Sequence, residues 1–131
     1  MKFDHIGIFV KSLEIGQKHL TKIFKINNWS QIYYDPVQKV DVQFGYDISN
    51  ICYELVAPNG ENNPVDKVLK DGKNVLNHVA YKVNNINDEI VRLQNNRCLL
   101  ISGPNPAIAF ENKKIAFLYT PLKFIIELIE Q

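Results

Sequence analysis

Two segments of the chain, Phe3–Val10 and Leu76–Val83, contain nearly the same string, and this repetition constrains the fold more than any other feature. Aligning His5 with His78 gives an offset of 73 residues. The offset holds downstream without a gap, since apolar positions of the first half fall on apolar positions of the second: Leu13 on Ile86, Leu20 on Leu93, Phe44 on Phe117 and Leu55 on Leu128. The chain is therefore predicted to consist of two structurally equivalent halves.

The first half has the pattern of a strand, a helix and three further strands. Residues 3–10 are rich in β-branched and aromatic side chains, and a helix is expected from the Ser12 cap to about Lys25. Strands are then expected at residues 29–34, 37–47 and 51–57. Asp41 and Gln43 alternate with apolar residues of the third strand, so one or both are expected to face the cupped side of the sheet.

The second half repeats this order. We expect a strand at 76–83, a helix after the Asn85 cap, and strands at 97–102, 114–120 and 124–130, with a loop at 103–106 that breaks regular structure. One helical turn is expected in the connection, around 65–69. The prediction is a single α+β domain over residues 1–131, with a βαβββ module at about 1–58, a connection at 59–75 and a second βαβββ module at about 76–131.

Composition and charge exclude several classes of function. A chain of 131 residues with 46% apolar and 22% charged residues suits one globular domain. The net charge of +1 leaves no basic stripe for nucleic acid. No apolar run is long enough to span a bilayer, and no signal peptide is expected because the sequence starts directly in a strand-like segment. Two cysteines are too few for a disulfide framework, so a cytoplasmic location is expected, with no nucleic-acid or membrane partner.

Each half carries one histidine near its start and one glutamate near its end, separated by 49 residues in both cases: His5 and Glu54, His78 and Glu127. Each glutamate interrupts an apolar strand, where an unpaired carboxylate would cost several kcal/mol. Two imidazoles and two carboxylates suit one divalent ion per chain, such as Ni²⁺, Co²⁺, Zn²⁺ or Mn²⁺. The sequence therefore predicts a metal site formed by these four residues; the repeat permits ligands from one chain or from two.

Four strings in register carry a family resemblance: Asp4-His5-Ile6-Gly7, Tyr53-Glu54-Leu55-Val56-Ala57-Pro58, Asn77-His78-Val79-Ala80-Tyr81-Lys82-Val83 and Ile126-Glu127-Leu128-Ile129-Glu130. Over essentially its whole length the chain resembles the vicinal oxygen chelate superfamily. The resemblance implies the glyoxalase/bleomycin resistance/dioxygenase fold, in which paired βαβββ modules form a cupped, partly open barrel-like sheet.

Within that superfamily the ligand pattern is most similar to glyoxalase I. The resemblance implies a metal-dependent lyase, like lactoylglutathione lyase, that isomerises the hemithioacetal of a 2-oxoaldehyde and a thiol through an enediolate. It also implies that Glu127 transfers the proton, with Glu54 as the second catalytic carboxylate. Arginines that would hold the carboxylates of glutathione have no counterpart here, so the thiol is left open.

Two alternatives remain open. The first is a racemase similar to methylmalonyl-CoA epimerase, acting on a 2-substituted acyl thioester; related epimerases often have glutamine at the position of Glu54. The second is a non-enzymatic member that binds a ligand in the cupped surface. In either enzymatic case the partner is a small-molecule thiol or thioester, and a homodimer is expected because half-open modules expose apolar sheet surface.

Overall fold

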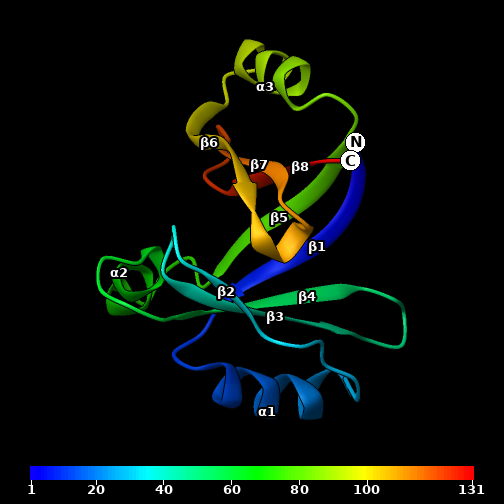
Figure 1. Cartoon of the computed structure of the whole chain (residues 1–131), viewed down its shortest axis with the longest axis vertical. Coiled ribbons are helices and arrows are strands. Elements are labelled where there is room, and N and C mark those ends of the chain that lie inside the picture. The colour runs from blue at the N-terminus through cyan, green and yellow to red at the C-terminus, as the bar shows by residue number, and fades with distance from the viewer. The chain divides into compact units, whose positions relative to one another are not determined.

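The structure, a computed structural model that describes residues 1–131, separates into two units (Figure 1). The N-terminal unit comprises His5–Asn77, and the C-terminal unit comprises His78–Gln131 together with Met1–Asp4. The boundary therefore runs through the first strand, whose first residues pack with the second half of the chain. The element order in each half is β-α-β-β-β, which confirms the predicted repeat.

The N-terminal unit contains a sheet with the strand order β2-β3-β4-β1. Strand β3 is antiparallel to both of its neighbours, whereas β1 and β4 are parallel. Helix α1 packs on one face through Leu13, which joins a buried cluster with Leu55 and Ala57. The elements are β1 (Lys2–Phe9), α1 (Leu13–Ile23), β2 (Tyr33–Asp35), β3 (Val40–Tyr46), β4 (Cys52–Pro58) and the connecting helix α2 (Pro64–Asp71).

The C-terminal unit repeats this arrangement with the strand order β5-β8-β7-β6. Here β5 and β8 are parallel and β7 is antiparallel to its neighbours. The core lies between the sheet and α3, where Ile86, Ile90 and Leu93 pack against Leu118 and Leu128. The elements are β5 (Leu76–Val83), α3 (Ile86–Asn95), β6 (Leu99–Ala107), the 3₁₀ turn η1 (Ile108–Phe110), β7 (Lys113–Tyr119) and β8 (Ile125–Glu130).

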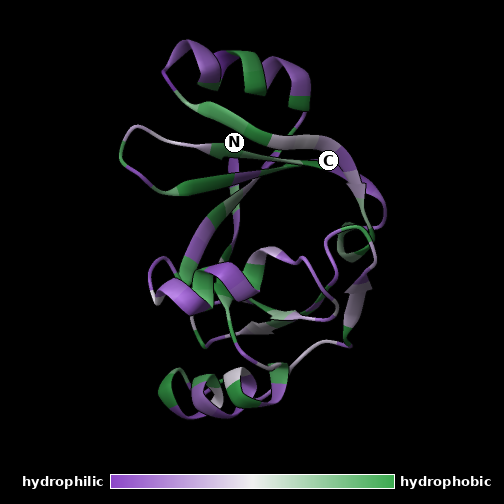
Figure 2. Ribbon diagram, turned by 90° about the vertical axis from the view of Figure 1, so that its left-hand side faces the viewer, coloured by the Kyte–Doolittle hydropathy of each residue, from purple (hydrophilic) through white to green (hydrophobic).

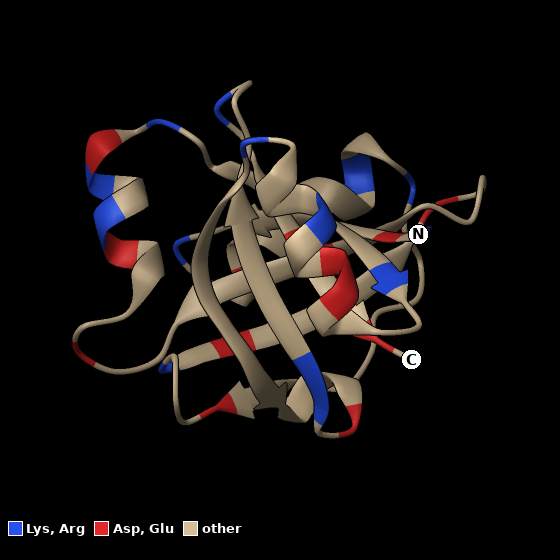
Figure 3. Cartoon of the chain, turned by 90° about the horizontal axis from the view of Figure 1, so that it is seen from above, with Lys and Arg blue, Asp and Glu red and all other residues tan.

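The helices begin at the side chains that the sequence indicates. Ser12 Oγ accepts a hydrogen bond from the Ile15 amide, and Asn85 Oδ1 accepts one from the Asp88 amide. Hydrophobic and hydrophilic residues alternate along the helices, so each has an apolar side to bury (Figure 2). Acidic and basic residues are interspersed over helices and loops (Figure 3). None of the helices has the length and apolar character needed to cross a membrane.

Helix α2 is longer than the single turn expected in the connection. Asn63 caps it by accepting hydrogen bonds from the amides of Val65 and Asp66, and Pro64 occupies the first turn, where its missing N–H costs nothing. Gly72 ends the helix with a left-handed φ of 67°. Start and stop signals within this polar segment therefore suffice for a full short helix.

The predicted strand at 29–34 is mostly wrong. Only Tyr33–Asp35 forms β2, while Trp29 makes an isolated bridge to Gly45. The Trp29 indole packs over Gly45, and its Nε1 donates a hydrogen bond to Thr21 Oγ1 of α1. The large aromatic residue that suggested a strand instead anchors the loop between α1 and the sheet.

The predicted break at residues 103–106 is also wrong, because β6 continues through it to Ala107. The strand lies at the edge of the sheet, and its pairing with β7 shifts register between Leu100 and Ser102 and again between Ser102 and Asn105. Pro104 removes a backbone donor, which an edge strand tolerates because one of its sides has no partner strand. Gly103 takes a φ of 89° at these irregularities.

Candidate metal centre

In the N-terminal unit, His5 of β1 and Glu54 of β4 form a buried pair. His5 Nε2 lies 3.5 Å from Glu54 Oε2. The exposed fraction is 0% for His5 and 4% for Glu54. Strands β1 and β4 are parallel, and their register places Gly7 of β1 opposite Glu54 of β4. His5 lies two residues before Gly7 on the same face of β1. Since Gly7 has no side chain, the imidazole and the carboxylate can approach each other diagonally across the two strands.

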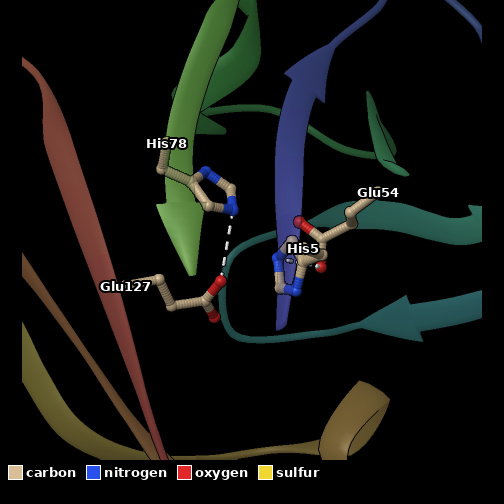
Figure 4. A group of neighbouring side chains, drawn as sticks. All are labelled: His5, Glu54, His78 and Glu127. Carbon is tan, nitrogen blue, oxygen red and sulfur yellow. Dashed lines mark ion pairs between the residues drawn. The ribbon is translucent and has the colours of Figure 1, made fainter. Parts of the chain in front are cut away.

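The C-terminal unit contains an equivalent pair, His78 of β5 and Glu127 of β8. His78 Nε2 lies 3.1 Å from Glu127 Oε2 (Figure 4), and their exposed fractions are 5% and 2%. Ala80 stands opposite Glu127, as Gly7 stands opposite Glu54, so the neighbouring residue is again small. The 73-residue offset therefore holds for the ligand pair and for the space around it.

A phenylalanine accompanies each pair, a feature that was not singled out from the sequence. The rings of Phe44 and His5 lie 5.8 Å apart between centroids with an interplanar angle of 74°, and those of Phe117 and His78 lie 5.7 Å apart at 79°. Both contacts are edge-to-face. The repeat offered a signal for them, since the offset aligns Phe44 with Phe117 inside the same register.

The other polar residues expected near the site lie elsewhere. Gln43 Nε2 donates a hydrogen bond to the Ser30 carbonyl, and Asp41 Oδ1 accepts one from Asn59 Nδ2. Phe44, not Gln43, stands opposite Glu54 in the register of β3 and β4. The expectation that Gln43 or Asp41 faces the cupped side of the sheet is therefore wrong. Gln43 is buried, but it lies opposite Leu55, on the other face of the sheet from Phe44 and Glu54.

The donor atoms of both pairs fit a divalent first-row ion. All four residues are buried, and each offers one ligand atom. When Nε2 is deprotonated, each imidazole offers a lone pair to a cation, and a mixed set of imidazole nitrogen and carboxylate oxygen suits Zn²⁺, Ni²⁺, Co²⁺ or Mn²⁺. Buried carboxylates also need a compensating positive charge. The residues present in each unit therefore fit a metal ligand set.

Comparison with known proteins identifies relatives over nearly the whole chain. The profile of the Glyoxalase/Bleomycin resistance protein/Dioxygenase superfamily matches residues 4–117. The uncharacterised protein YqjC of Bacillus subtilis is 27% identical over 117 residues, which cover 89% of this chain and 81% of YqjC.

Solved structures give the same result for the fold. A hypothetical protein from Bacillus halodurans superimposes with a TM-score of 0.80 at 24% identity, covering 99% of this chain and 94% of that one. Methylmalonyl-CoA epimerase from Mycobacterium tuberculosis superimposes with a TM-score of 0.79 at 21% identity, covering 98% and 87%. The same enzyme from Streptomyces coelicolor, in complex with 2-nitronate-propionyl-CoA, gives a TM-score of 0.77 at 17% identity, covering 100% and 97%. These matches confirm the predicted fold. With a family profile that spans most of its length, the chain belongs to the Glyoxalase/Bleomycin resistance protein/Dioxygenase superfamily.

Proposed function

We propose that the two His–Glu pairs together bind one divalent metal ion and that the protein is a metal-dependent enzyme. One observation carries the proposal: a buried imidazole and a buried carboxylate meet twice, at equivalent positions of the repeat. A single buried pair could be a local solution to the burial of one glutamate. Two equivalent pairs call for one partner that satisfies both carboxylates, and a cation does so.

The reaction that we propose is proton transfer at the carbon next to the carbonyl of a 2-substituted acyl thioester. The structural neighbours support this choice, since they include methylmalonyl-CoA epimerases, one of them in complex with methylmalonyl-CoA. The epimerase type of reaction, which the sequence placed second, is therefore our first candidate.

In this proposal the carboxylate of Glu127 takes the proton from the substrate carbon. The C–H bond breaks, its electron pair moves toward the carbonyl, and the proton resides on a Glu127 oxygen. A bound divalent ion supplies positive charge that stabilises the negative charge on the carbonyl oxygen. Glu54 in its protonated form is our candidate donor of a proton to the opposite face; this transfer leaves Glu54 ionised and Glu127 protonated, and it restores the thioester with inverted configuration. His5 and His78 hold the site and do not transfer the proton.

The second candidate is a glyoxalase I-type lyase, and the identity of residue 54 favours it. Glu54 supplies a carboxylate at the ligand position where related epimerases often have glutamine. A lyase moves the proton between two adjacent carbons of a hemithioacetal, so the same pair of carboxylates could serve it. The two candidates share the proton abstraction and differ in the atom that receives the proton.

Deuterium exchange tests the proposal whatever the 2-substituent of the substrate is. The purified protein, reconstituted with Zn²⁺, Co²⁺, Ni²⁺ or Mn²⁺, is incubated in D₂O with a panel of 2-methyl acyl-CoA thioesters, including methylmalonyl-CoA, and separately with methylglyoxal and a thiol. We expect deuterium at the 2-position of a thioester, with inversion of configuration. Formation of a lactoyl thioester would favour the lyase instead. Full activity of the metal-free protein, or binding of these compounds without exchange, would contradict the proposal.

The expected homodimer remains a prediction for sedimentation velocity.

A further inference from the structure

In each unit a phenylalanine packs beside the ligand histidine, so this contact also occurs twice in the chain. Phe44 lies directly opposite Glu54 in the register of β3 and β4, and Phe117 lies directly opposite Glu127 in that of β7 and β8. Each ring also makes the edge-to-face contact with the histidine of its own unit. Within each unit a single ring thus shares the sheet face with both members of the pair.

This geometry bears on the orientation of the imidazoles. Rotation about the bond between Cβ and the ring has a broad energy profile, so the ring plane of a histidine is set by its contacts. Edge-to-face packing favours particular ring planes, because the positive edge of one ring meets the negative face of the other. In both units the resulting plane directs Nε2 to the carboxylate.

Each phenylalanine is itself held, by different neighbours in the two units. Tyr33 of β2 packs against Phe44 with the ring centroids 6.1 Å apart at 65°. Phe117 instead packs against a buried aliphatic cluster that includes Ala80, Ile115 and Ile129. The contact with the histidine is common to both units although the support behind it differs. The contact between phenylalanine and histidine is therefore the feature that both units have in common.

We propose that Phe44 and Phe117 are positioning residues that fix the ring planes of His5 and His78 with Nε2 directed to the metal. This inference rests on the proposed function, because it assigns the two rings a role toward the ion that the His–Glu pairs bind. It predicts that replacing either ring with an aliphatic side chain weakens metal binding while the four ligands stay intact.

Metal affinity is the first readout. The dissociation constants for Zn²⁺ and Co²⁺ are measured by competition with a chromophoric chelator for wild type, Phe44→Leu, Phe117→Leu and the double variant. An aromatic contact of this kind corresponds to roughly a three- to tenfold change in affinity. We expect that loss for each single variant and roughly a ten- to hundredfold loss for the double variant. Phe44→Tyr, which keeps the ring, should stay near the wild-type value.

Phe24→Leu is the matched control. The Phe24 ring stacks on Tyr53, with centroids 4.8 Å apart, and the substitution removes the same number of atoms from the same unit as Phe44→Leu. We expect it to change the metal affinity less than twofold. Equal losses in Phe24→Leu and Phe44→Leu would overturn the inference, because the effect would then follow from general destabilisation.

A second readout uses the metal-free protein and separates the two proposals. In NMR spectra with labelled histidine, the wild type should show cross-relaxation between the imidazole and phenylalanine protons of each pair, and one sharp set of imidazole signals. Phe44→Leu should broaden or average the His5 signals and leave those of His78 unchanged. The proposed function fails if the wild type binds no metal. The positioning role fails if the His5 signals in Phe44→Leu are the same as in the wild type. If wild type binds metal and the leucine variants match it, only the positioning role fails.

Discussion

His78 Nε2 and Glu127 Oε2 lie 3.1 Å apart in an almost fully buried environment. The equivalent atoms of His5 and Glu54, 73 residues earlier in the chain, lie 3.5 Å apart. A buried carboxylate and a buried imidazole each lose hydration on folding, and their mutual contact offsets part of that cost. The repetition of this relationship is the basis of the metal proposal.

The double variant His5→Ala/His78→Ala should lose the divalent ion. Wild-type protein reconstituted with Zn²⁺ should contain about one ion per chain by elemental analysis, since the four residues supply one ligand set. At a free metal concentration about 100 times the dissociation constant, the ion should raise the free energy of unfolding by about 2.7 kcal/mol. Neither the ion nor this stabilisation should appear in the double variant. Full metal occupancy in the double variant would contradict the ligand assignment.

Glu127→Gln should retain appreciable metal but lower kcat by about 100-fold or more, the usual scale for removing a general base. Glu54→Gln should slow the exchange of the substrate proton less, because Glu127 still removes that proton and glutamine still offers a ligand oxygen, but inversion should be lost together with its proton donor. The assay is deuterium exchange, with metal content measured on the same samples. If Glu54→Gln is instead the inactive variant, the two glutamates exchange roles.

Gly103→Ala should destabilise the protein more than Gly72→Ala does. Both glycines have positive φ, 89° and 67°, where a Cβ costs about 1–2 kcal/mol. A Cβ on Gly103 would lie 2.4 Å from the Ile115 carbonyl oxygen, whereas one on Gly72 would meet nothing within 4 Å. We expect Gly103→Ala to lower the free energy of unfolding by about 1–3 kcal/mol more, measured by chemical denaturation. Equal losses would show that β6 adjusts around the added atom.

Glu130→Ala should lower the free energy of unfolding by about 1 kcal/mol. Glu130 Oε2 accepts a hydrogen bond from the Ile86 amide at the start of α3, 3.0 Å away, and thereby joins the end of β8 to the first turn of the helix. Without the carboxylate, this amide of a buried residue loses its partner. Glu130→Gln keeps an acceptor oxygen and is the control. Similar losses in both variants would indicate that the charge, rather than the hydrogen bond, supports the helix.

Much of the fold and of the candidate site could be predicted because the same pattern of apolar and ligand residues occurs twice in the chain. An apolar or small residue that recurs at the same offset is constrained by the same environment in both halves. His5, Glu54, His78 and Glu127 were found in this way, whereas the caps at Ser12 and Asn85 were predicted from their residue type at the start of an apolar helical pattern. Strand periodicity also predicted that Glu54 interrupts an apolar strand, which made its burial, and hence its need for a partner, foreseeable.

The sequence by itself therefore determined the element order, the repeat and the residues that form each His–Glu pair. Only the tertiary structure decided which face each strand presents and how far the irregular strands extend. Phe44 rather than Gln43 accompanies Glu54 because a cross-strand register, set by hydrogen bonds between β3 and β4, fixes side-chain parity. Trp29 lies outside the strand because its ring packs on Gly45. Strand β6 continues through Gly103 and Pro104 because it is an edge strand of the sheet. These outcomes depend on contacts between residues distant in the chain, which local propensity does not contain.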